Sequence, residues 1–382
     1  MKVLILGGDG YLGWPTAMHF SRRGHEVAVV DNYLRRRLCQ ELDVTPLCDV
    51  PSLHQRSRLW RETSGDEIPV HVFDLCDWKP TAELFRDFQP DAVVHYAEQP
   101  SGPYSMIDQR AARLTIENNL VSTLNVAHAV RAHCPQCHVV KLGTMGEYGT
   151  PNVDIEEGWI EIEHKGRKDK FLFPRQAGSL YHTTKIMDTD LLWFYVRVWG
   201  LRVTDLMQGP VYGITTEENA EDPRLLPIFN YDAVFGTVLN RFAVQAVCGY
   251  PLTIYGKGGQ IRGYLNIRDT LASVRLAVEN PAAPGEHRIF NQFTETFSVQ
   301  DLAERVERVG KAMGLDVRRE AIANPRVEAD EHYYNPVHRG LVELGLEPHL
   351  LTDDVVAGIV ETVQRYRDRI DERLMLPTVQ WR

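Results

Sequence analysis

The most constraining feature of this chain is a glycine-rich turn that directly follows its first apolar strand. The segment KVLILGG (2–8) runs into Gly10 and Gly13, and a second apolar strand, EVAVVD, ends on Asp31. Gly10 lets the backbone approach a pyrophosphate, and Gly13 lets the following helix pack close to the sheet. The amide groups at the start of that helix lack partners within the helix and favour an anion. The order of strand, glycine turn, helix and acid predicts a dinucleotide site.

The residue at the end of the second strand indicates which dinucleotide binds. A carboxylate at Asp31 is placed to accept hydrogen bonds from the ribose hydroxyls of adenosine, and it would repel a 2′-phosphate. This favours NAD over NADP. The arginine run Arg35, Arg36 and Arg37 points the other way, because arginine is how NADP enzymes hold the 2′-phosphate.

The composition is that of an ordinary globular protein. The chain has 382 residues, of which 43% are hydrophobic and 25% charged, and its net charge is −10. This acidic balance argues against nucleic acid as a partner. No stretch of about 18 apolar residues suggests a membrane span, and the first strand begins at the N-terminus, so a cytoplasmic location is expected. Six scattered cysteines, including the Cys134–Cys137 pair, give neither a disulfide framework nor a metal ligand set.

Strands and helices alternate through the first half of the chain. Apolar strands are expected near 2–8, 26–31, 69–75, 91–97, 138–144 and 202–209, and helices near 16–24, 81–88, 110–132 and 182–199. A long polar segment at 33–69 interrupts them. Strands that are apolar on both faces and alternate with helices predict an α/β fold with a doubly wound parallel sheet. We expect a Rossmann domain over 1–205, with returning segments at about 236–270, and a smaller, mainly substrate-binding α/β domain over 206–382.

A candidate catalytic pair stands at the start of the helix near 182–199. Tyr181 and Lys185 are four residues apart, so their side chains share one helix face. An ammonium beside a phenol favours the phenolate, and a phenolate can take the proton of a sugar hydroxyl while a hydride leaves for a nicotinamide. Thr144 follows the strand VVKLG, and its hydroxyl can share a hydrogen bond with the substrate oxygen.

These residues make the chain resemble the extended short-chain dehydrogenase/reductases that act on nucleotide-sugars. The resemblance implies NAD as cofactor and a homodimer built on the helices near 110–132 and 182–199. The cofactor residues that it implies are Gly7, Gly10, Tyr11, Leu12, Gly13, Asp31, Asn32, Arg35, Asp74, Leu75, Tyr96, Asn119, Tyr181 and Lys185. The substrate residues that it implies are Gln99, Thr144, Met145, Gln208, Asn240, Tyr255, Arg262, Asn291 and Arg326, with arginines on the diphosphate. The apolar stripes expected at the dimer interface are Leu114, Leu120, Leu124 and Ala127 on one helix and Ile186, Leu191, Phe194 and Tyr195 on the other.

Longer segments resemble one branch of that family, the UDP-sulfoquinovose synthases. They are KLGTMGEYGTPNVDIEEG, YDAVFGTVLNRF, GKGGQIRGYLNIRD, FNQFTETFSV and NPRVEADEHYYNP. That resemblance implies conversion of UDP-glucose and sulfite to UDP-sulfoquinovose through a 4-keto-5-ene intermediate. Ordinary 4,6-dehydratases carry an acid where this chain has Met145, so plain dehydratase action is disfavoured. Glu147 and His182 remain as groups that can move the C5 proton and the C6 hydroxyl.

Four positions depart from the synthase pattern: Pro100 stands for arginine, Met207 for asparagine, Asn266 for aspartate and Pro210 for valine. The first two remove a cation and an amide that we expect near the reacting sugar. The alternative interpretation is a related NAD-dependent nucleotide-sugar or nucleoside dehydratase or epimerase that does not use sulfite. A redox-sensing regulator is disfavoured because a sensor does not need the base formed by Tyr181 and Lys185.

Overall fold

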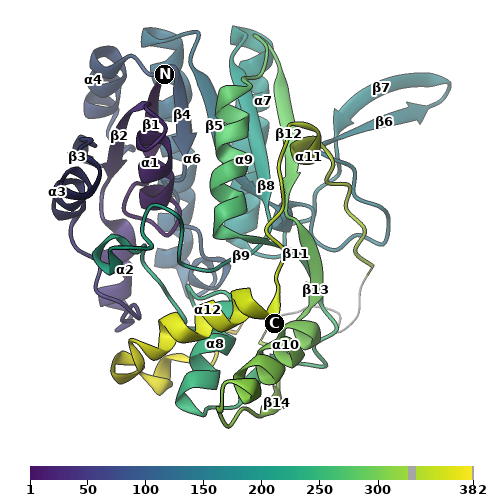
Figure 1. Cartoon of the computed structure of the whole chain (residues 1–382). Coiled ribbons are helices and arrows are strands. Elements are labelled where there is room, and N and C mark those ends of the chain that lie inside the picture. Colours follow the sequence, from purple (N-terminus) through teal and green to yellow (C-terminus); the bar gives the residue numbers. More distant parts are fainter. Residues whose placement is uncertain (326–332, 381–382) are drawn as a thin grey trace.

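A computed structural model, which describes residues 1–325 and 333–380, is built around a seven-stranded parallel sheet covered by helices on both faces (Figure 1). The strand order is β12-β8-β5-β4-β1-β2-β3, and every neighbouring pair is parallel. The strands are β1 (Lys2–Leu6), β2 (Glu26–Asp31), β3 (Val70–Val72), β4 (Ala92–His95), β5 (His138–Thr144), β8 (Arg202–Gln208) and β12 (His287–Gln292). The predicted α/β class with a doubly wound parallel sheet is therefore confirmed.

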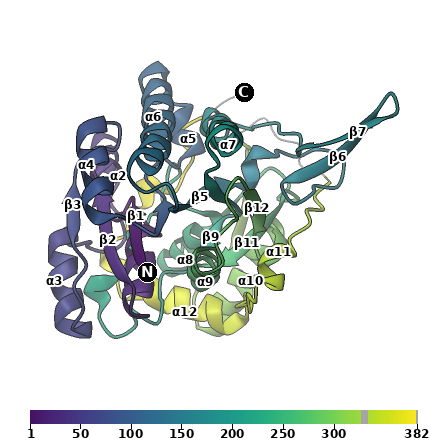
Figure 2. The same cartoon turned by 90° about the horizontal axis from the view of Figure 1, so that it is seen from above.

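Two apolar clusters, one on each face, hold the helices against the sheet. Within β1, Val3 and Ile5 face one cluster, whereas Leu4 and Leu6 face the other, as the two-residue period of a strand requires. The first face packs α1 (Gly13–Ser21), α3 (Leu53–Ser64) and α9 (Ile267–Glu279). The second packs α4 (Trp78–Phe88), α6 (Gln109–His133) and α7 (Leu180–Trp199) (Figure 2).

The segment at 33–69, expected as a long polar interruption between the strands and helices, contains two helices, α2 (Leu34–Glu41) and α3. Ser52 and Gln55 form a capping box at the start of α3. Leu53 and Trp60, seven residues apart, are both buried against the sheet. Two apolar residues on one face are enough to dock a helix of otherwise polar composition, and a composition-based prediction misses them.

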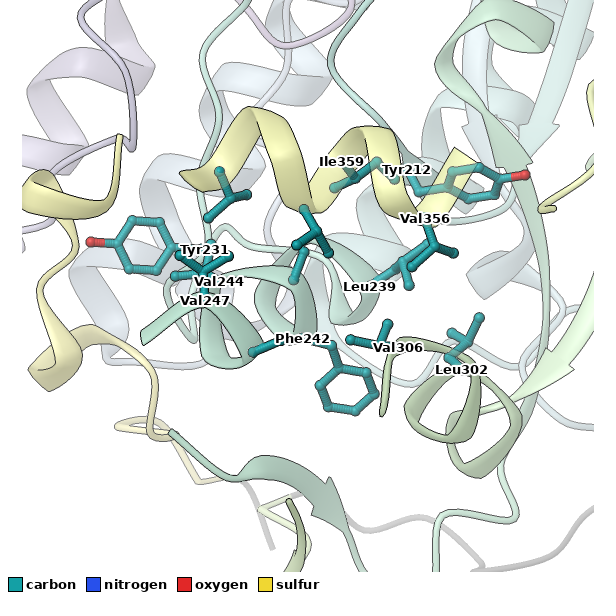
Figure 3. Packing of buried hydrophobic residues seen from close by; sticks show 14 of the residues in the cluster. Tyr212, Tyr231, Leu239, Phe242, Val244, Val247, Leu302, Val306, Val356 and Ile359 are labelled. Atoms are coloured by element: carbon teal, nitrogen blue, oxygen red, sulfur yellow. The ribbon is translucent and has the colours of Figure 1, made fainter. Parts of the chain in front are cut away.

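A second core lies beyond the carboxyl edge of the sheet (Figure 3). It is built by α8 (Val238–Cys248), α10 (Val299–Ala312) and α12 (Asp353–Gln364), with two small sheets beside them. The strands of these sheets are β9 (Val211–Tyr212), β10 (Leu252–Tyr255), β11 (Ile261–Asn266), β13 (Glu295–Ser298) and β14 (Arg319–Ile322). Further elements are the short helices α5 (Gly102–Ser105) and α11 (Gly340–Glu343) and the hairpin of β6 (Trp159–His164) and β7 (Arg167–Leu172).

The chain returns to the main sheet later than the sequence suggested. The returning elements are α9 and β12, over 267–292, whereas α8, inside the expected segment 236–270, packs in the second core. An amphipathic helix can cover either core, so its composition alone does not choose between them. The domain boundaries themselves stay a prediction. Within the part of the chain that the structure describes, no helix is both long and apolar enough to cross a membrane.

A substitution of Phe242 can test the packing of the second core. Its ring is completely buried among residues of α8 and α10, including Leu302 and Val306 (Figure 3). Phe242→Ala should lower the free energy of unfolding by about 3–5 kcal/mol, since the cavity it leaves closes only in part. Urea unfolding followed by circular dichroism measures this. Val342→Ala on α11, where the valine is 52% exposed, should change stability little. Equal losses in both variants would contradict the packing.

Candidate active site

A cavity of about 870 Å³ opens where the carboxyl ends of the sheet strands meet the second core. Ligands of open parallel α/β sheets bind at this edge. Most of the residues singled out from the sequence lie in its wall. They are Gly7, Gly10, Tyr11, Leu12, Gly13, Asp31, Asn32, Arg35, Asp74, Leu75, Tyr96, Thr144, Met145, Tyr181, His182, Gln208, Tyr255 and Arg262.

Other predicted residues lie behind the wall or away from it. Asn119 accepts a hydrogen bond from the Gln99 amide at 2.8 Å and donates to the Thr184 hydroxyl at 3.0 Å, so it supports the cavity rather than lining it. Asn240 is buried behind Tyr11, and Asn291 donates to the Val337 carbonyl at 2.6 Å. Glu147 and Lys185 are also absent from the wall. Arg326 lies outside the described residues.

The glycine turn has the geometry of a phosphate cradle. A Cβ on Gly13 would run into the carbonyl oxygen of Gly7, so only glycine lets α1 start this close to the turn. The amide of Asp9 donates to Asp31 Oδ2 at 2.9 Å, which holds the end of β2 against the turn. Burial, followed by the neighbouring Asp9 carboxylate, raises the pKa of Asp31 to about 6.

One residue of the arginine run, Arg36, is held by a carboxylate of the turn itself. Arg36 donates to both Asp9 oxygens at 2.7 and 2.8 Å, and the completely buried Arg56 donates to Asp9 at 2.5 Å. Arg35 lies over the Phe235 ring at 4.0 Å. Because Asp9 occupies Arg36, this side chain is not available for a 2′-phosphate. The residues of the turn therefore fit NAD, with Asp31 facing the cavity.

Tyr181 lies in the first turn of α7, whose N-cap is Ser179. Lys185 lies one turn further along and forms an ion pair with Glu98, with Nζ 2.5 Å from Oε2 and both side chains 3% exposed. The pKa of Tyr181 is raised rather than lowered in this structure. Burial is the largest cause and the Glu98 carboxylate is the next. Glu98 thus opposes the lowering of the Tyr181 pKa that is expected from Lys185. The local sequence gives no sign of this partner.

The imidazole ring of His182 packs against Gly146 in the cavity wall. A Cβ on Gly146 would overlap the imidazole Nε2, so the ring of His182 occupies the space that a side chain at 146 would need. The other ring nitrogen, Nδ1, lies 3.1 Å from the Ser179 hydroxyl, which orients the ring. Glu147 points away from the cavity, and its Oε1 accepts from the Thr144 amide at 3.3 Å. The turn after β5 presents Thr144 to the cavity and keeps Glu147 beneath it, while α7 presents His182.

A buried ion cluster lies below this turn. Lys141, on β5, is fully buried and contacts Asp205 at 3.1 Å, Glu147 at 3.4 Å and the Thr189 hydroxyl at 2.7 Å. It also donates to the backbone carbonyl of Lys185 at 3.1 Å. One ammonium group therefore connects β5, β8, α7 and the turn that carries Thr144.

The four departures from the synthase pattern lie in different surroundings. Pro100 lines the cavity, as expected for a position near the substrate. Met207 does not: its side chain is fully buried in an apolar cluster with Tyr148 and Phe293, because alternate residues of β8 face opposite sides. Met207 therefore lies behind the cavity wall, in the same cluster as the wall residue Met145, and does not line the cavity itself. Asn266 caps α9 by accepting from the Arg268 amide at 3.0 Å, and Pro210 lies in the cavity wall.

Several cavity residues were not predicted from the sequence, among them Glu98, Arg241 and Tyr334. The guanidinium of Arg241 lies 5.0 Å from the centre of the Tyr255 ring. Arg241 directly follows Asn240 in a segment already singled out, and an arginine beside expected diphosphate ligands is a usable signal. Glu98 has no comparable local signal, because only the fold brings it to Lys185.

Sequence comparisons place these features among known enzymes. The model of the NAD dependent epimerase/dehydratase family matches residues 3–291. The chloroplastic UDP-sulfoquinovose synthase of Spinacia oleracea is 51% identical over 381 residues, which cover 100% of this chain and 79% of the relative. The UDP-sulfoquinovose synthase of Sulfolobus acidocaldarius is 44% identical over 385 residues, covering 100% and 98%.

Solved structures share the fold at lower identity. The UDP-glucose 4-epimerase of Thermus thermophilus, solved with NAD, has a TM-score of 0.67 and 24% identity, covering 95% of this chain and 99% of the other. The UDP-glucuronic acid 4-epimerase of Bacillus cereus, solved with UDP-glucuronic acid and NAD, has a TM-score of 0.70 and 18% identity, covering 96% and 99%.

The buried cluster leads to a prediction about Lys141→Met. The substitution leaves the carboxylates of Glu147 and Asp205 buried without the Lys141 ammonium. It should lower the free energy of unfolding by about 3–5 kcal/mol near neutral pH. Burial is the largest influence on the pKa of Asp205 and raises it, but Lys141, the next largest, together with His287, the Thr189 hydroxyl and Lys185, outweighs burial, and the pKa is lowered. A carboxyl with a lowered pKa adds stability above its usual titration range and loses it as the pH falls through the lowered value.

The difference in stability between Lys141→Met and the wild type should therefore narrow on acidification, because protonation relieves the carboxyls in the variant. Urea unfolding at neutral pH and at about pH 5 measures this difference. A difference that stays constant, or that widens at the lower pH, would contradict the role of Lys141 as the counter-charge of these carboxyls.

Proposed function

The chain belongs to the NAD-dependent epimerase/dehydratase family, and from this premise we propose that it is a UDP-sulfoquinovose synthase, which converts UDP-glucose and sulfite to UDP-sulfoquinovose. The observation that carries the proposal is that Thr144, Tyr181 and His182 meet in one cavity wall at the carboxyl edge of the sheet. The two relatives that match along the whole chain carry this name and supply the identity of the substrates.

The cofactor would be held by the glycine turn and the residues around it. Gly10 and Gly13 leave space for the pyrophosphate beside the start of α1, Asp31 faces the adenosine ribose, and Tyr96 lines the same cavity. When bound, NAD supplies a reversible hydride acceptor for C4 of the sugar. The nucleotide-sugar diphosphate would lie against Arg262 and Arg241, which reach the wall from β11 and α8.

Tyr181 and Thr144 act on the C4 hydroxyl in this proposal. The Tyr181 oxygen takes the proton of that hydroxyl as C4 is oxidised, and the Thr144 hydroxyl orients the same oxygen. The resulting 4-ketone makes the proton on C5 acidic. At the end of the cycle Tyr181 returns its proton to the oxygen on C4, which becomes a hydroxyl again.

His182 is the group that we assign to C5 and C6. Its imidazole faces the cavity from the position that a side chain at 146 would occupy, whereas Glu147 is turned into the buried cluster. The imidazole takes the C5 proton, the C6 hydroxyl leaves as water after gaining a proton, and the 4-keto-5-ene results. Sulfite forms the new carbon–sulfur bond at C6, and C5 is reprotonated. Glu147 then serves to hold the turn rather than to move a proton.

Of the two departures that we expected near the sugar, only Pro100, which stands in place of an arginine, lines the cavity; Met207 does not. The replacement at position 100 is therefore the one that can affect the binding of sulfite. A dianion can be held by other cations or by backbone amides when one arginine is replaced. Loss of the cation instead favours the alternative, a related dehydratase or epimerase that does not use sulfite. The choice between the two depends on whether a sulfonated product forms.

The function is tested by incubating the purified protein with UDP-glucose in deuterated water, with and without sulfite, and analysing the products by mass spectrometry. We expect a sulfonated nucleotide-sugar only when sulfite is present, with deuterium at C5. Deuterium at C5 without any sulfonated product would favour the alternative. A protein that neither exchanges the C5 proton nor sulfonates would contradict both assignments.

Tyr181→Phe should reduce turnover by about 10²–10⁴-fold, because it removes the hydroxyl that carries the C4 proton. The ring keeps its shape, so NAD and UDP-glucose should still bind, which calorimetry can verify. Tyr148→Phe is the control, since Tyr148 is a buried tyrosine that packs in an apolar cluster and does not line the cavity. Near wild-type turnover in Tyr181→Phe would contradict the assignment of Tyr181 as the carrier of the C4 proton.

We infer that two copies of the chain associate through α6 and α7. On α7, Met187, Phe194 and Val198 are 45%, 48% and 51% exposed, and their spacing puts them on one helix face. Four residues of the expected stripes pack instead with the apolar cluster on the chain's own sheet: Leu124, Ala127, Leu191 and Tyr195. The exposed side of α7 thus offers an apolar surface next to α6.

Light scattering at micromolar concentration should give the mass of a dimer for the wild type. Phe194→Lys should give the mass of a monomer, because it buries a charge in the apolar contact. Ile162→Lys on the β6–β7 hairpin, where the isoleucine is 39% exposed, should leave the dimer intact. The mass of a monomer for the wild type would contradict the inferred dimer.

A further inference from the structure

The segment at 231–237 joins the two cores and has no role in the steps described so far. Tyr231, at its start, packs in the second core. Val234 packs instead in a separate apolar cluster, together with Leu34 of α2 and Tyr104 of α5. Residues 233–237 all line the cavity. The segment therefore forms the part of the wall where the second core meets the residues that follow β2 and β4.

Hydrogen bonds hold this segment in one conformation. Asp232 Oδ1 accepts from the amides of Val234 at 2.9 Å and Phe235 at 2.8 Å. The amide of Gly236 donates to the Asp232 carbonyl at 3.0 Å. The hydroxyl of Ser101, in the loop after β4, donates to the Val234 carbonyl at 2.5 Å. A turn that is fixed by its own aspartate and tied to a second loop gives Phe235 a defined place in the wall.

The Phe235 ring contacts two side chains from elements that follow strands of the main sheet. Tyr104 stacks on it, with the ring centres 6.3 Å apart and an angle of 21° between the planes. The Arg35 guanidinium lies over the same ring, 4.0 Å from its centre. A cation over an aromatic face at this distance is attracted by the ring. Arg35 also lines the cavity, so Phe235 holds the guanidinium in the part of the wall that follows β2.

The guanidinium keeps hydrogen-bonding capacity for a ligand. Its Nη1 is buried and has no hydrogen-bond partner among the residues that the structure describes. Arg36 differs, because its donors are taken by both oxygens of Asp9. A buried donor without a partner lowers stability unless a ligand or water satisfies it. A planar cation that follows Asp31 by four residues suits the flat adenine and the negative charge of a dinucleotide.

We propose that Phe235 is a positioning residue for the cofactor. Its ring holds the Arg35 guanidinium against the adenosine half of the dinucleotide, so a segment of the second core slows the release of NAD. The inference rests on the proposed function only in that the hydride taken from C4 returns to C4 within one cycle. Release of the reduced cofactor between these two steps would leave the 4-ketone without its hydride.

The test measures how fast the reduced dinucleotide leaves the purified protein. The protein is loaded with NADH and mixed with an excess of NAD, and the loss of fluorescence from bound NADH gives the dissociation rate. Phe235→Leu should release NADH about tenfold faster than the wild type, because the contact with the guanidinium is lost. Phe235→Tyr keeps an aromatic face under the guanidinium, so its dissociation rate should stay near that of the wild type.

A double variant separates positioning from a general loss of structure. Arg35→Met should speed the release of NADH by a similar factor, and it provides the test if Phe235→Leu does not fold. In the Arg35→Met background, Phe235→Leu should change the rate little further, because the two residues act as one unit. Calorimetry with ADP-ribose, which contains the adenosine half alone, should show the same order of affinities. Binding of UDP should be unchanged in all variants.

The matched control is Phe297→Leu, which removes another ring beneath an arginine. Arg305 lies 5.2 Å from the centre of that ring, and Phe297 packs on the second core without lining the cavity. This control should leave the release of NADH unchanged. Equal dissociation rates in Phe235→Leu and the wild type, an equal change in Phe297→Leu, or full additivity with Arg35→Met would overturn the proposal. None of these measurements needs UDP-glucose or sulfite, so their outcome is independent of whether the protein sulfonates a sugar.

Discussion

The ammonium group of Lys141 is the contact on which the centre of the molecule depends. It is fully buried in β5 and reaches Asp205, Glu147, the Thr189 hydroxyl and the Lys185 carbonyl. A buried cation is tolerated only when partners with good geometry surround it. The register of β5 against β8, the position of α7 and the turn after β5 must therefore agree with one another. That agreement puts the hydroxyls of Thr144 and Tyr181 in the same cavity wall.

The cavity itself exists because two cores meet at the carboxyl edge of the sheet. The main sheet contributes the glycine turn and the ends of its strands, which suit a dinucleotide. The second core contributes Arg241, Tyr255 and Arg262, which suit a diphosphate and a flat base. The proposed reacting centre lies between these parts, where His182 fills the space left by Gly146. Binding and chemistry are thus divided between elements with separate hydrophobic support.

Charge balance beneath Tyr181 links the fold to the proposed chemistry. Lys141 is engaged by Asp205 and Glu147, and Lys185 is engaged by Glu98. Both buried lysines are thus balanced by carboxylates that come from other elements of the fold. The surroundings of the proposed proton carrier therefore depend on how the loop after β4, strands β5 and β8 and helix α7 pack together.

The sequence by itself determined six of the seven strands of the sheet and four of the helices that cover it, α1, α4, α6 and α7, but not α3, α9 or β12. It also predicted the glycine turn as the place for a dinucleotide. Strand periodicity, the glycine turn and the spacing of Tyr181 and Lys185 are local properties, so β5 and α7 appear within two residues of their predicted bounds. Only the tertiary structure decided which side chains reach the cavity. Met207 and Glu147 turn away from it, and Glu98 reaches Lys185 from a distant strand end. Such choices depend on which elements pack together across the chain, and local sequence does not carry that information.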